Sequence, residues 1–441
     1  MKKYSYLVTF AVIAVIIAVF GFLYFADYLD FAKPVIKLNP DISAIGKQKK
    51  IAIAFTDERS GLSQLAVEIV QDNKGQIVFS EAIPARGVKL KDAVLTIDTA
   101  ALKLHDGPAT INITAKDYAL FKNEGIISQT IKIDTLPPQI NLFSTINNVN
   151  QGGSCFVAYR ISKPAMLTGI YVNNYFSPGF TIMIDNKPTT VAYFAIPSDA
   201  ARSNTKITVF ARDEAGNETT AALPFQLKEK KFRADKMNLS DNFLQQKMPE
   251  FQAMVPELQG KTPLEVFNYV NGKMRTDNFQ VIQEICQKSA AKKFWDGTFL
   301  RMPKAKPMAL FGDKRSYMVN NQIIAHSVHQ GVDLASTASA PIEAANNGLV
   351  LFAAPLGIYG NCVIIDHGLG LLSLYSHLSV INTKPGKMVK KEEVIGHSGK
   401  TGLAGGDHLH FSILAGGQFV NPQEWWDPHW INDNISRKMI F

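Results

Sequence analysis

The sequence predicts a mainly β protein with an N-terminal transmembrane helix, two β-sandwich modules, a short helical connector and a C-terminal antiparallel β domain. Three observations predict this fold class. The chain begins with a long apolar stretch, its middle consists of short β-type runs broken by turn residues, and helical periodicity is concentrated near residues 238–290. With 441 residues the chain is too long for one hydrophobic core, and we expect about three domains.

The first segment is expected to anchor the chain in a membrane. After Lys2 and Lys3, the stretch from Tyr4 to Ala26 is uncharged and rich in Val, Ile, Leu and Phe. A helix needs about 20 such residues to cross the hydrocarbon core, whereas a cleaved signal has an apolar core of about 7–15 residues and small residues before its cleavage point. Bulky Tyr24 therefore favours an anchor over a cleaved signal. Positive residues precede the span and Asp27 follows it, which predicts a cytoplasmic N-terminus with the rest of the chain outside.

Short β-type runs fill the middle of the chain. Runs such as Ile51–Phe55 and Ile131–Ile133, without long helical periods between them, favour β-sandwiches. The stretch Ile111–Asp117 recurs in similar form as Ile207–Asp213, an offset that suits a module of about 100 residues. Paired prolines within Asp134–Pro138 predict the linker. The passage resembles bacterial immunoglobulin-like spacer domains, and one larger irregular β domain is the alternative.

A helical connector is expected after the second module. A stretch with apolar residues at helical intervals begins at Ser240, and Thr262–Glu265 has the pattern of a capping box with proline at the first helical position. Val266 and Phe267 then begin a buried face. The charges of this segment are expected to lie on a solvated face rather than in a binding site.

Overall composition is that of an ordinary globular protein. Apolar residues make up 46% of the sequence and charged residues 19%, which gives no sign of wholesale disorder. The formal net charge is +8, and a basic surface suits nucleic acid, anionic lipid or an acidic polymer. Because no nucleic-acid-binding motif accompanies this charge, we expect no nucleic-acid partner.

The three cysteines, Cys155, Cys286 and Cys362, are far apart in the sequence and none has CxxC spacing. A cysteine metal site or redox motif is therefore not predicted. The odd count leaves at least one cysteine unpaired, and a disulfide between Cys155 and Cys286 stays open. Cys362 lies in an apolar run of strand character and is expected to be a small core residue.

Two phrases near the C-terminus have the spacing of metal ligands: His329–Asp333, which has the form His-x-Gly-x-Asp, and His408–His410. In an extended strand, residues two or four apart point to the same face, so each phrase presents both of its end residues together. A catalytic zinc site uses three protein ligands and leaves one coordination position for water. Two strands on either side of a cleft would supply two histidines, a carboxylate and a spare histidine.

These phrases and the sequence around them resemble the lysostaphin-type zinc endopeptidases of bacterial cell walls. The resemblance extends over residues 308–425 and includes Gly360–Gly368, Tyr375–Ser379 and Gly396–Gly402. One stretch departs from the family pattern, because Leu403–Asp407 replaces the usual Ser-Thr-Gly before His-Leu-His. That loop would border the substrate groove, so the departure bears on cleavage preference more than on zinc binding.

The resemblance implies one zinc ion per chain, held by His329, Asp333 and His410. Asp333 could instead orient a histidine from outside the ligand set. The two non-ligand active-site histidines of the family fall on His377 and His408. Zinc lowers the pKa of its bound water toward about 7 and polarises the scissile carbonyl. The two further histidines would orient or deprotonate this water and hydrogen-bond the developing oxyanion, and the sequence does not assign these roles between them.

Four further residues are predicted to belong to the substrate groove. Arg315 matches the beginning of the family's domain and would contact substrate carboxylates or pin its own loop. Tyr359 and Asn361 would form part of the groove wall. His326 precedes the first motif by three residues and would line the groove as well. His367, which follows a β-type run and precedes Gly-Leu-Gly, is expected to lie in a turn.

The predicted function is hydrolysis of peptide cross-links in peptidoglycan by a membrane-anchored zinc metalloendopeptidase. The predicted location is the inner membrane of a bacterium, with a single span and most of the chain in the periplasm. One alternative is a non-catalytic regulator that binds the wall and activates amidases, and a weaker one is a structural wall-binding protein. Known regulators of that kind have lost zinc ligands, whereas this chain keeps all of them. A regulatory protein partner stays unidentified.

These features predict five parts: a cytoplasmic tip and membrane anchor at 1–32, immunoglobulin-like modules at 33–136 and 137–228, a helical connector at 229–296 and the peptidase domain at 297–441. The stretch between anchor and peptidase is far longer than a tether requires. We expect its modules or helices either to cover the groove part of the time or only to set the reach of the peptidase.

Overall fold

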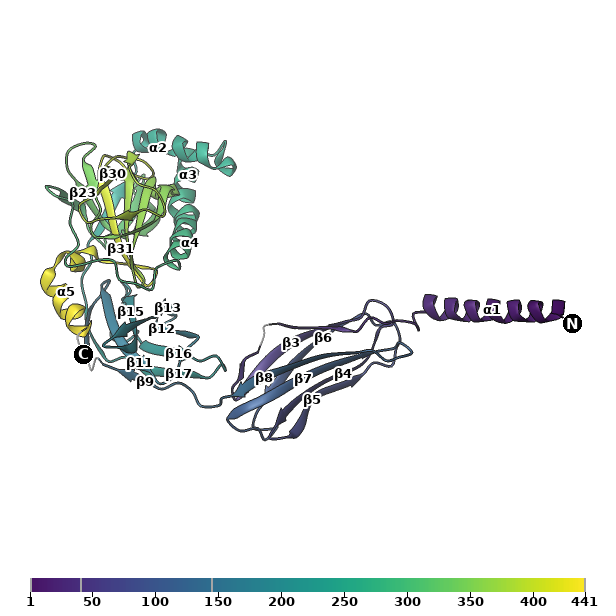
Figure 1. Cartoon of the computed structure of the whole chain (residues 1–441). Helices are drawn as coiled ribbons and strands as arrows, with labels where there is room; N and C mark the ends of the chain where they lie inside the picture. The colour runs from purple at the N-terminus through teal and green to yellow at the C-terminus, as the bar shows by residue number, and fades with distance from the viewer. Residues whose placement is uncertain (1, 40–41, 144–145, 440–441) are drawn as a thin grey trace. The chain divides into compact units, whose positions relative to one another are not determined.

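The computed structural model describes residues 2–39, 42–143 and 146–439, which divide into two compact units (Figure 1). The first unit runs to Pro138 and includes short segments at 164–166 and 212–218. The second unit contains the other residues from Gln139 onward. Strands predominate in the β regions and the C-terminal domain, which confirms the mainly β fold class.

The N-terminal helix α1 (Lys2–Phe25) confirms the predicted apolar helix. Its segment Tyr6–Phe25 is long and apolar enough to cross a membrane, and none of it is buried in the protein. The assignment of a possible membrane span rests on length and composition alone, and a signal sequence near an N-terminus has the same length and composition. Membrane anchoring is therefore part of the function proposed below.

The first unit contains two sheets that share one aliphatic core. The smaller sheet has the order β1 (Val35–Asn39), β3 (Gln48–Thr56), β6 (Leu90–Asp98). The larger has the order β2 (Ala44–Ile45), β8 (Glu124–Ile133), β7 (Gly107–Asp117), β4 (Leu62–Gln71), β5 (Lys74–Ala82). Phe55 from the smaller sheet and Val67 and Ile111 from the larger lie in the same buried cluster. Alternate residues thus point inward from both sheets, as in a sandwich.

A second β region, in the second unit, has the same layered construction. One sheet has the order β14 (Phe180–Ile184), β15 (Lys187–Ala195), β11 (Ser154–Ile161), β9 (Ile140–Leu142). The other has the order β13 (Tyr175–Pro178), β12 (Leu167–Val172), β16 (Ile207–Arg212), β17 (Glu218–Ala222), and β10 (Asn147–Asn150) pairs with β18 (Phe225–Lys228). Val157, Phe194 and Val209 belong to its core. The immunoglobulin-like assignment of both regions, and the five domain boundaries, stay predictions.

The connector is helical as expected, but a strand that the sequence did not predict precedes its helices. Its helices are α2 (Asp241–Met254), α3 (Pro263–Tyr269) and α4 (Arg275–Cys286), with a π-helical turn at Val270–Met274. Ser240 caps α2, and Thr262 with Glu265 forms the predicted capping box of α3. The unpredicted strand β19 (Ala234–Asn238) pairs in parallel with β21 (Lys314–Val319). Because that partner is distant in sequence, local periodicity gives no sign of the strand.

The C-terminal domain is built on an antiparallel sheet, as predicted. Its order is β20 (Lys306–Ala309), β23 (Val332–Ala335), β31 (Leu409–Ala415), β27 (Leu371–Leu378), β26 (Asn361–Gly368), β25 (Gly348–Pro355), β29 (Met388–Val389), and β32 (Gln418–Val420) pairs with β31. Two smaller sheets have three strands each. One has the order β24 (Pro341–Glu343), β30 (Val394–His397), β28 (Val380–Ile381), and the other has the order β19, β21, β22 (Gln322–Val328). The chain then forms α5 (Pro428–Asn434), flanked by 3-10 turns at Pro422–Trp426 and Ser436–Met439.

The connector packs along the C-terminal sheet, and Figure 1 shows α3 and α4 beside its strands. Phe267 of α3 and Ile282 of α4 lie in one buried cluster with Leu374 and Leu414 of that sheet. The second β region packs on the same domain through Trp425, which is fully buried. These contacts position the connector next to the C-terminal strands that carry the histidine motifs.

The three cysteines are all buried and free, so Cys155 and Cys286 form no disulfide. Cys362 lies in β26 as the core residue that the sequence predicted. Burial raises the pKa of Cys155 to about 11 and that of Cys286 to about 12. These thiols are protonated at neutral pH and therefore unreactive.

Candidate metal centre

Strand pairing brings the two histidine motifs together. β23 and β31 are antiparallel neighbours, and their register places Asp333 directly opposite His410. His329 directly follows β22, three residues before β23 begins. The three residues are 6% (His329), 9% (Asp333) and 6% (His410) exposed, so their polar atoms meet one another rather than solvent.

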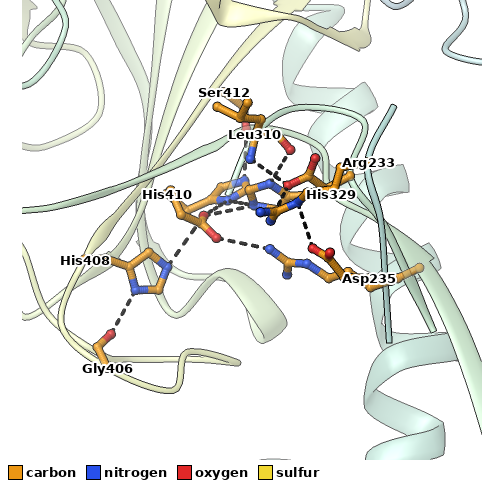
Figure 2. A network of polar contacts seen from close by, with 12 residues as sticks. Arg233, Asp235, Leu310, His329, Gly406, His408, His410 and Ser412 are labelled. Atoms are coloured by element: carbon orange, nitrogen blue, oxygen red, sulfur yellow. Dashed lines mark hydrogen bonds and ion pairs between the residues drawn. The ribbon is translucent and has the colours of Figure 1, made fainter. Parts of the chain in front are cut away.

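Each of these three residues offers one ligand atom, and the three atoms lie within 4.8 Å of one another. Figure 2 shows His329 and His410 side by side in this network of polar contacts. Asp333 Oδ1 lies 2.9 Å from His329 Nε2 and 2.8 Å from His410 Nδ1. His329 Nε2 and His410 Nδ1 are 3.0 Å apart. Ligand atoms of a tetrahedral zinc ion with bonds of about 2.0–2.1 Å lie roughly 3.3 Å from one another. The triangle is therefore of the size that one such ion needs.

The ring nitrogens of His329 and His410 that face away from Asp333 have partners of their own, and this leaves the inner nitrogens directed at the carboxylate. His329 Nδ1 donates to the carbonyl oxygen of Leu310 at 2.9 Å, which leaves Nε2 of the neutral ring with a lone pair directed at Asp333. His410 contacts Ser412 Oγ through Nε2 at 3.0 Å and turns Nδ1 toward the same carboxylate. A lone pair of His329 Nε2 that faces a carboxylate needs a proton or a metal ion between the two groups. Two imidazoles and one carboxylate are a donor set that catalytic zinc sites use.

The carboxylate itself is held in its ionised form. Burial acts to raise the pKa of Asp333, but its contacts with the imidazoles of His329, His408 and His410 outweigh burial and hold the pKa well below its usual range. Arg315 Nη2 lies 3.2 Å from Asp333 Oδ2, the oxygen that does not face the two ligand histidines. Arg315 therefore lies in the centre, where it orients Asp333, rather than only pinning its own loop.

Two further histidines flank the three. His377, at the end of β27, and His408 have ring centroids 4.9 Å apart, and the ring centroid of His377 is 5.8 Å from that of His410. Each is fixed by a backbone carbonyl: His377 Nδ1 donates to Thr401 at 2.8 Å and His408 Nδ1 to Gly406 at 2.9 Å. Both therefore direct their Nε2 atoms away from those carbonyls.

His377 has both an unusual backbone conformation and a shifted side-chain pKa. Its φ is 63°, a left-handed backbone conformation that non-glycine residues seldom adopt. Burial, reinforced by the proximity of His410 and His408, lowers the pKa of His377 to about 3. Burial also opposes protonation of His408, but the negative charge of Asp333, whose Oδ1 lies 3.6 Å from His408 Nε2, outweighs it and raises the pKa of that ring.

These side chains line a cavity of about 390 Å³, which we call the metal groove. The five residues of the centre, together with Arg315 and Tyr359, belong to its lining. The divergent loop lines it through Leu403, Ala404 and Gly405, as the sequence predicted. The lining also includes connector residues that the sequence did not predict to lie in a groove: Met237, Asn238, Leu239, Phe243, Phe267 and Arg275. No local motif marks these residues, because packing alone brings them to the groove.

Two of the predicted groove residues lie elsewhere. His326 is exposed on β22, where its Nδ1 is 3.2 Å from Ser316 Oγ, and it is absent from the groove lining. Asn361 at the start of β26 donates its amide to the carbonyl oxygen of Leu378 at 3.0 Å and so ties neighbouring strands. His367 lies in a strand rather than a turn, buried between the Asn347 carbonyl and Ser373.

Comparison with known proteins relates this centre to a family of peptidases. Residues 327–422 match the model of peptidase family M23. The chain is 41% identical over 95 residues to the DD-carboxypeptidase/endopeptidase Mpg of Neisseria meningitidis serogroup B, covering 22% of this chain and 22% of that protein. It is 33% identical over 111 residues to the peptidoglycan DD-endopeptidase ShyA of Vibrio cholerae, covering 25% of each.

Among solved structures, the chain is similar to the catalytic domain of lysostaphin from Staphylococcus simulans. The sequence identity is 26%, the match covers 30% of this chain and 98% of that one, and the TM-score is 0.25. The two curated relatives are matched over no more than 25% of their lengths, so the similarity concerns the C-terminal domain.

Proposed function

We propose that this chain, whose residues 327–422 are a peptidase family M23 domain, is a membrane-anchored zinc endopeptidase that hydrolyses the peptide cross-links of peptidoglycan. The observation that carries the proposal is the convergence of His329, Asp333 and His410 on one point, with His377 and His408 beside them in one groove. A set of metal ligands alone would suit a structural site. Two additional histidines held by backbone carbonyls suit proton transfer.

Each residue of the centre has a proposed role. His329, Asp333 and His410 would hold the zinc, which when bound supplies polarisation of the scissile carbonyl and an acidified water. Arg315, whose Nη2 lies 3.2 Å from Asp333 Oδ2, would orient that carboxylate. His377 and His408 would accept and donate protons or hydrogen-bond the developing oxyanion, because their Nδ1 atoms are held by carbonyls and their Nε2 atoms face away from those carbonyls, that of His408 toward Asp333 Oδ1 at 3.6 Å.

The relatives and the N-terminal helix support the substrate and the location. The relatives' names include a peptidoglycan DD-endopeptidase, which supports the same substrate here. Helix α1 would cross the inner membrane of a bacterium once and leave the C-terminal domain in the periplasm. The predicted division into anchor, two modules, connector and peptidase belongs to this proposal.

The test is digestion of purified peptidoglycan by the detergent-solubilised full-length chain, with zinc content measured on the same sample. We expect about one zinc per chain and release of un-cross-linked peptides. The matched control is His410→Ala, which should release none. If the zinc-loaded wild-type chain releases no peptides but stimulates an amidase, the non-catalytic regulator is the better assignment.

A further inference from the structure

A second cavity of about 710 Å³ adjoins the metal groove within the same unit. It lies between the second β region, α4 and the C-terminal domain, and Arg275 and Tyr359 line both cavities. We call it the side pocket. A substrate bound in the metal groove therefore has a neighbouring cavity into which it can extend, past these two shared residues.

Arg275 is a partly buried cation without an acidic partner. It begins α4, and its guanidinium donates to Asn271, from Nη2 to Oδ1 at 3.1 Å and from Nε to the carbonyl oxygen at 3.4 Å. Among the described residues, no carboxylate forms an ion pair with it, whereas the nearby Lys273 is paired with Asp277 at 2.5 Å. An arginine stays charged at any physiological pH and carries five N–H donors. Several donors of Arg275 thus remain for an anion.

The charged residues that line the side pocket are two cations, Arg275 and Lys314, and one anion, Asp199. Lys314, the first residue of β21, lines the pocket, is exposed, and has no ion pair within the part of the chain that the structure describes. Asp199 is the one acidic residue among those that line this pocket, taking the described chain as a whole. The pocket therefore favours a negatively charged ligand group.

An aromatic wall completes the side pocket. The rings of Phe279 and Phe419 are stacked with centroids 5.7 Å apart, and those of Tyr359 and Phe419 are stacked at 6.5 Å. Small-molecule sites combine an apolar wall with a few placed polar groups. Here the wall comes from α4 and from the C-terminal domain, and the polar groups are the two cations.

We propose that the side pocket is a second substrate subsite, in which Arg275 and Lys314 hold a free carboxylate of the peptidoglycan stem peptide while the scissile bond lies in the metal groove. The inference rests on the proposed function, and it places a specificity determinant in the connector, outside the matched family domain. A guanidinium binds a carboxylate with two parallel hydrogen bonds, which makes Arg275 the stronger partner and Lys314 the weaker one.

The experiment uses the zinc-loaded full-length chain and a soluble cross-linked stem-peptide dimer, either with free terminal carboxylates or with the same groups amidated. For the wild-type chain we expect a KM about tenfold or more lower for the carboxylate form, as a charge-assisted pair predicts. Arg275→Gln should raise KM for the carboxylate form to the amidated level and leave kcat unchanged, because the contact binds ground state and transition state equally. Arg275→Lys should restore part of the difference, and Lys314→Gln should show a smaller loss.

Arg301→Gln is the matched control, since Arg301 is an exposed arginine that lies over Trp426 and lines neither cavity. It should behave as wild type with both substrates. Equal KM values for the two substrates with wild type, or an unchanged KM in Arg275→Gln, would overturn the subsite. Should Arg275→Gln fail to fold, the KM values of the wild-type chain and of Arg275→Lys for the two substrates still test the subsite.

Failure of the proposed function gives a different result from failure of the subsite. If the wild-type chain hydrolyses neither substrate, the affinity for the two peptides is measured instead of their hydrolysis. Calorimetry then compares binding of the carboxylate and amidated peptides to the full-length His410→Ala chain, with and without Arg275→Gln. Tighter binding of the carboxylate form that disappears with Arg275→Gln would support the subsite without hydrolysis. Equal affinities of the carboxylate and amidated peptides for both proteins would overturn the subsite.

Discussion

Two sets of residues line the metal groove, and they reach it by different routes. The first set, which includes His329, Asp333 and His410, lies in two short motifs that strand pairing brings face to face. The second set, which includes Phe267 and Arg275, comes from connector helices that pack against the same domain. The positions of the first set depend on the pairing of two strands, and its motifs can be recognised in the sequence. The second depends on tertiary packing, so the two should respond differently to substitution.

The difference also suggests a division of labour. Motif residues meet at 2.8–3.0 Å and are buried, so removing one leaves the others without a partner. Connector residues such as Phe243 and Arg275 border the groove and form none of the contacts within the centre. We therefore expect motif substitutions to abolish chemistry and connector substitutions to change substrate affinity.

The largest effect is expected for the ligands. His329→Ala, Asp333→Ala and His410→Ala should each abolish both zinc binding and hydrolysis, because a catalytic zinc site needs all three protein ligands. Metal analysis and peptide release from peptidoglycan provide the measurement. His326→Ala is the control, since that exposed histidine lies outside the groove and should keep full zinc and activity. Full zinc occupancy in His410→Ala would rule out this ligand set.

The next effect separates chemistry from metal binding. His377→Ala and His408→Ala should keep their zinc but lose hydrolysis by roughly 10²-fold or more, the usual cost of losing a positioned proton carrier or oxyanion donor. The loss should fall on kcat rather than on KM, in contrast to the connector variant Arg275→Gln. Loss of zinc in parallel with activity would make these residues ligands or supports of ligands instead.

Strand spacing predicted that the two motifs would meet, and Asp333 of β23 lies opposite His410 of β31, whereas metal binding by these residues stays a prediction. His326 is absent from the groove lining because it is exposed on β22, which ends at Val328, just before His329. Asn361 was also misplaced, because its amide is used by the Leu378 carbonyl of the neighbouring strand. His367 was assigned to a turn that begins only after Gly368.

The connector could not be read in the same way. Its helix caps at Ser240 and Thr262 are local signals: the sequence predicted the capping box at Thr262 and the start of a helical stretch at Ser240. Strand β19 and the position of Arg275 depend on distant segments, and a charge on an amphipathic helix has the same sequence pattern whether it meets solvent or a pocket. The β-sandwich character of both regions was predicted from short β-type runs broken by turn residues, whereas their immunoglobulin-like assignment stays a prediction.

A smaller effect, on stability, is expected where the second β region meets the C-terminal domain. Glu424 is buried there and accepts hydrogen bonds from Asn150 and from the amide and hydroxyl of Ser154. Burial raises the pKa of Glu424 from 4.5 to about 7, although these donors and Lys230 oppose the shift. The folded state thus binds more protons than the unfolded state between these pH values, and stability must fall as pH rises through that window.

The stability lost across this window is on the order of 3 kcal/mol. Thermal midpoints of the wild-type chain should therefore decrease between pH 5 and pH 8 more steeply than those of Glu424→Gln, which has no proton to release. The comparison isolates this group, because Asp366, whose pKa burial also raises, is present in both proteins. Parallel pH profiles for the two proteins would contradict the assignment.

The smallest effect tests whether the connector helices shape the groove at all. Thr262 and Glu265 cap α3 from its exposed end, while Phe267 on the same helix lines the metal groove. Thr262→Ala removes the capping bond and should lower stability by about 1 kcal/mol. Zinc content and kcat should stay at wild-type values, with KM for peptidoglycan peptides raised up to a few-fold because α3 frays beside the groove. Gln246→Ala on the exposed face of α2 serves as the control. If Thr262→Ala loses stability without any change in KM, α3 supports the fold but does not position substrate.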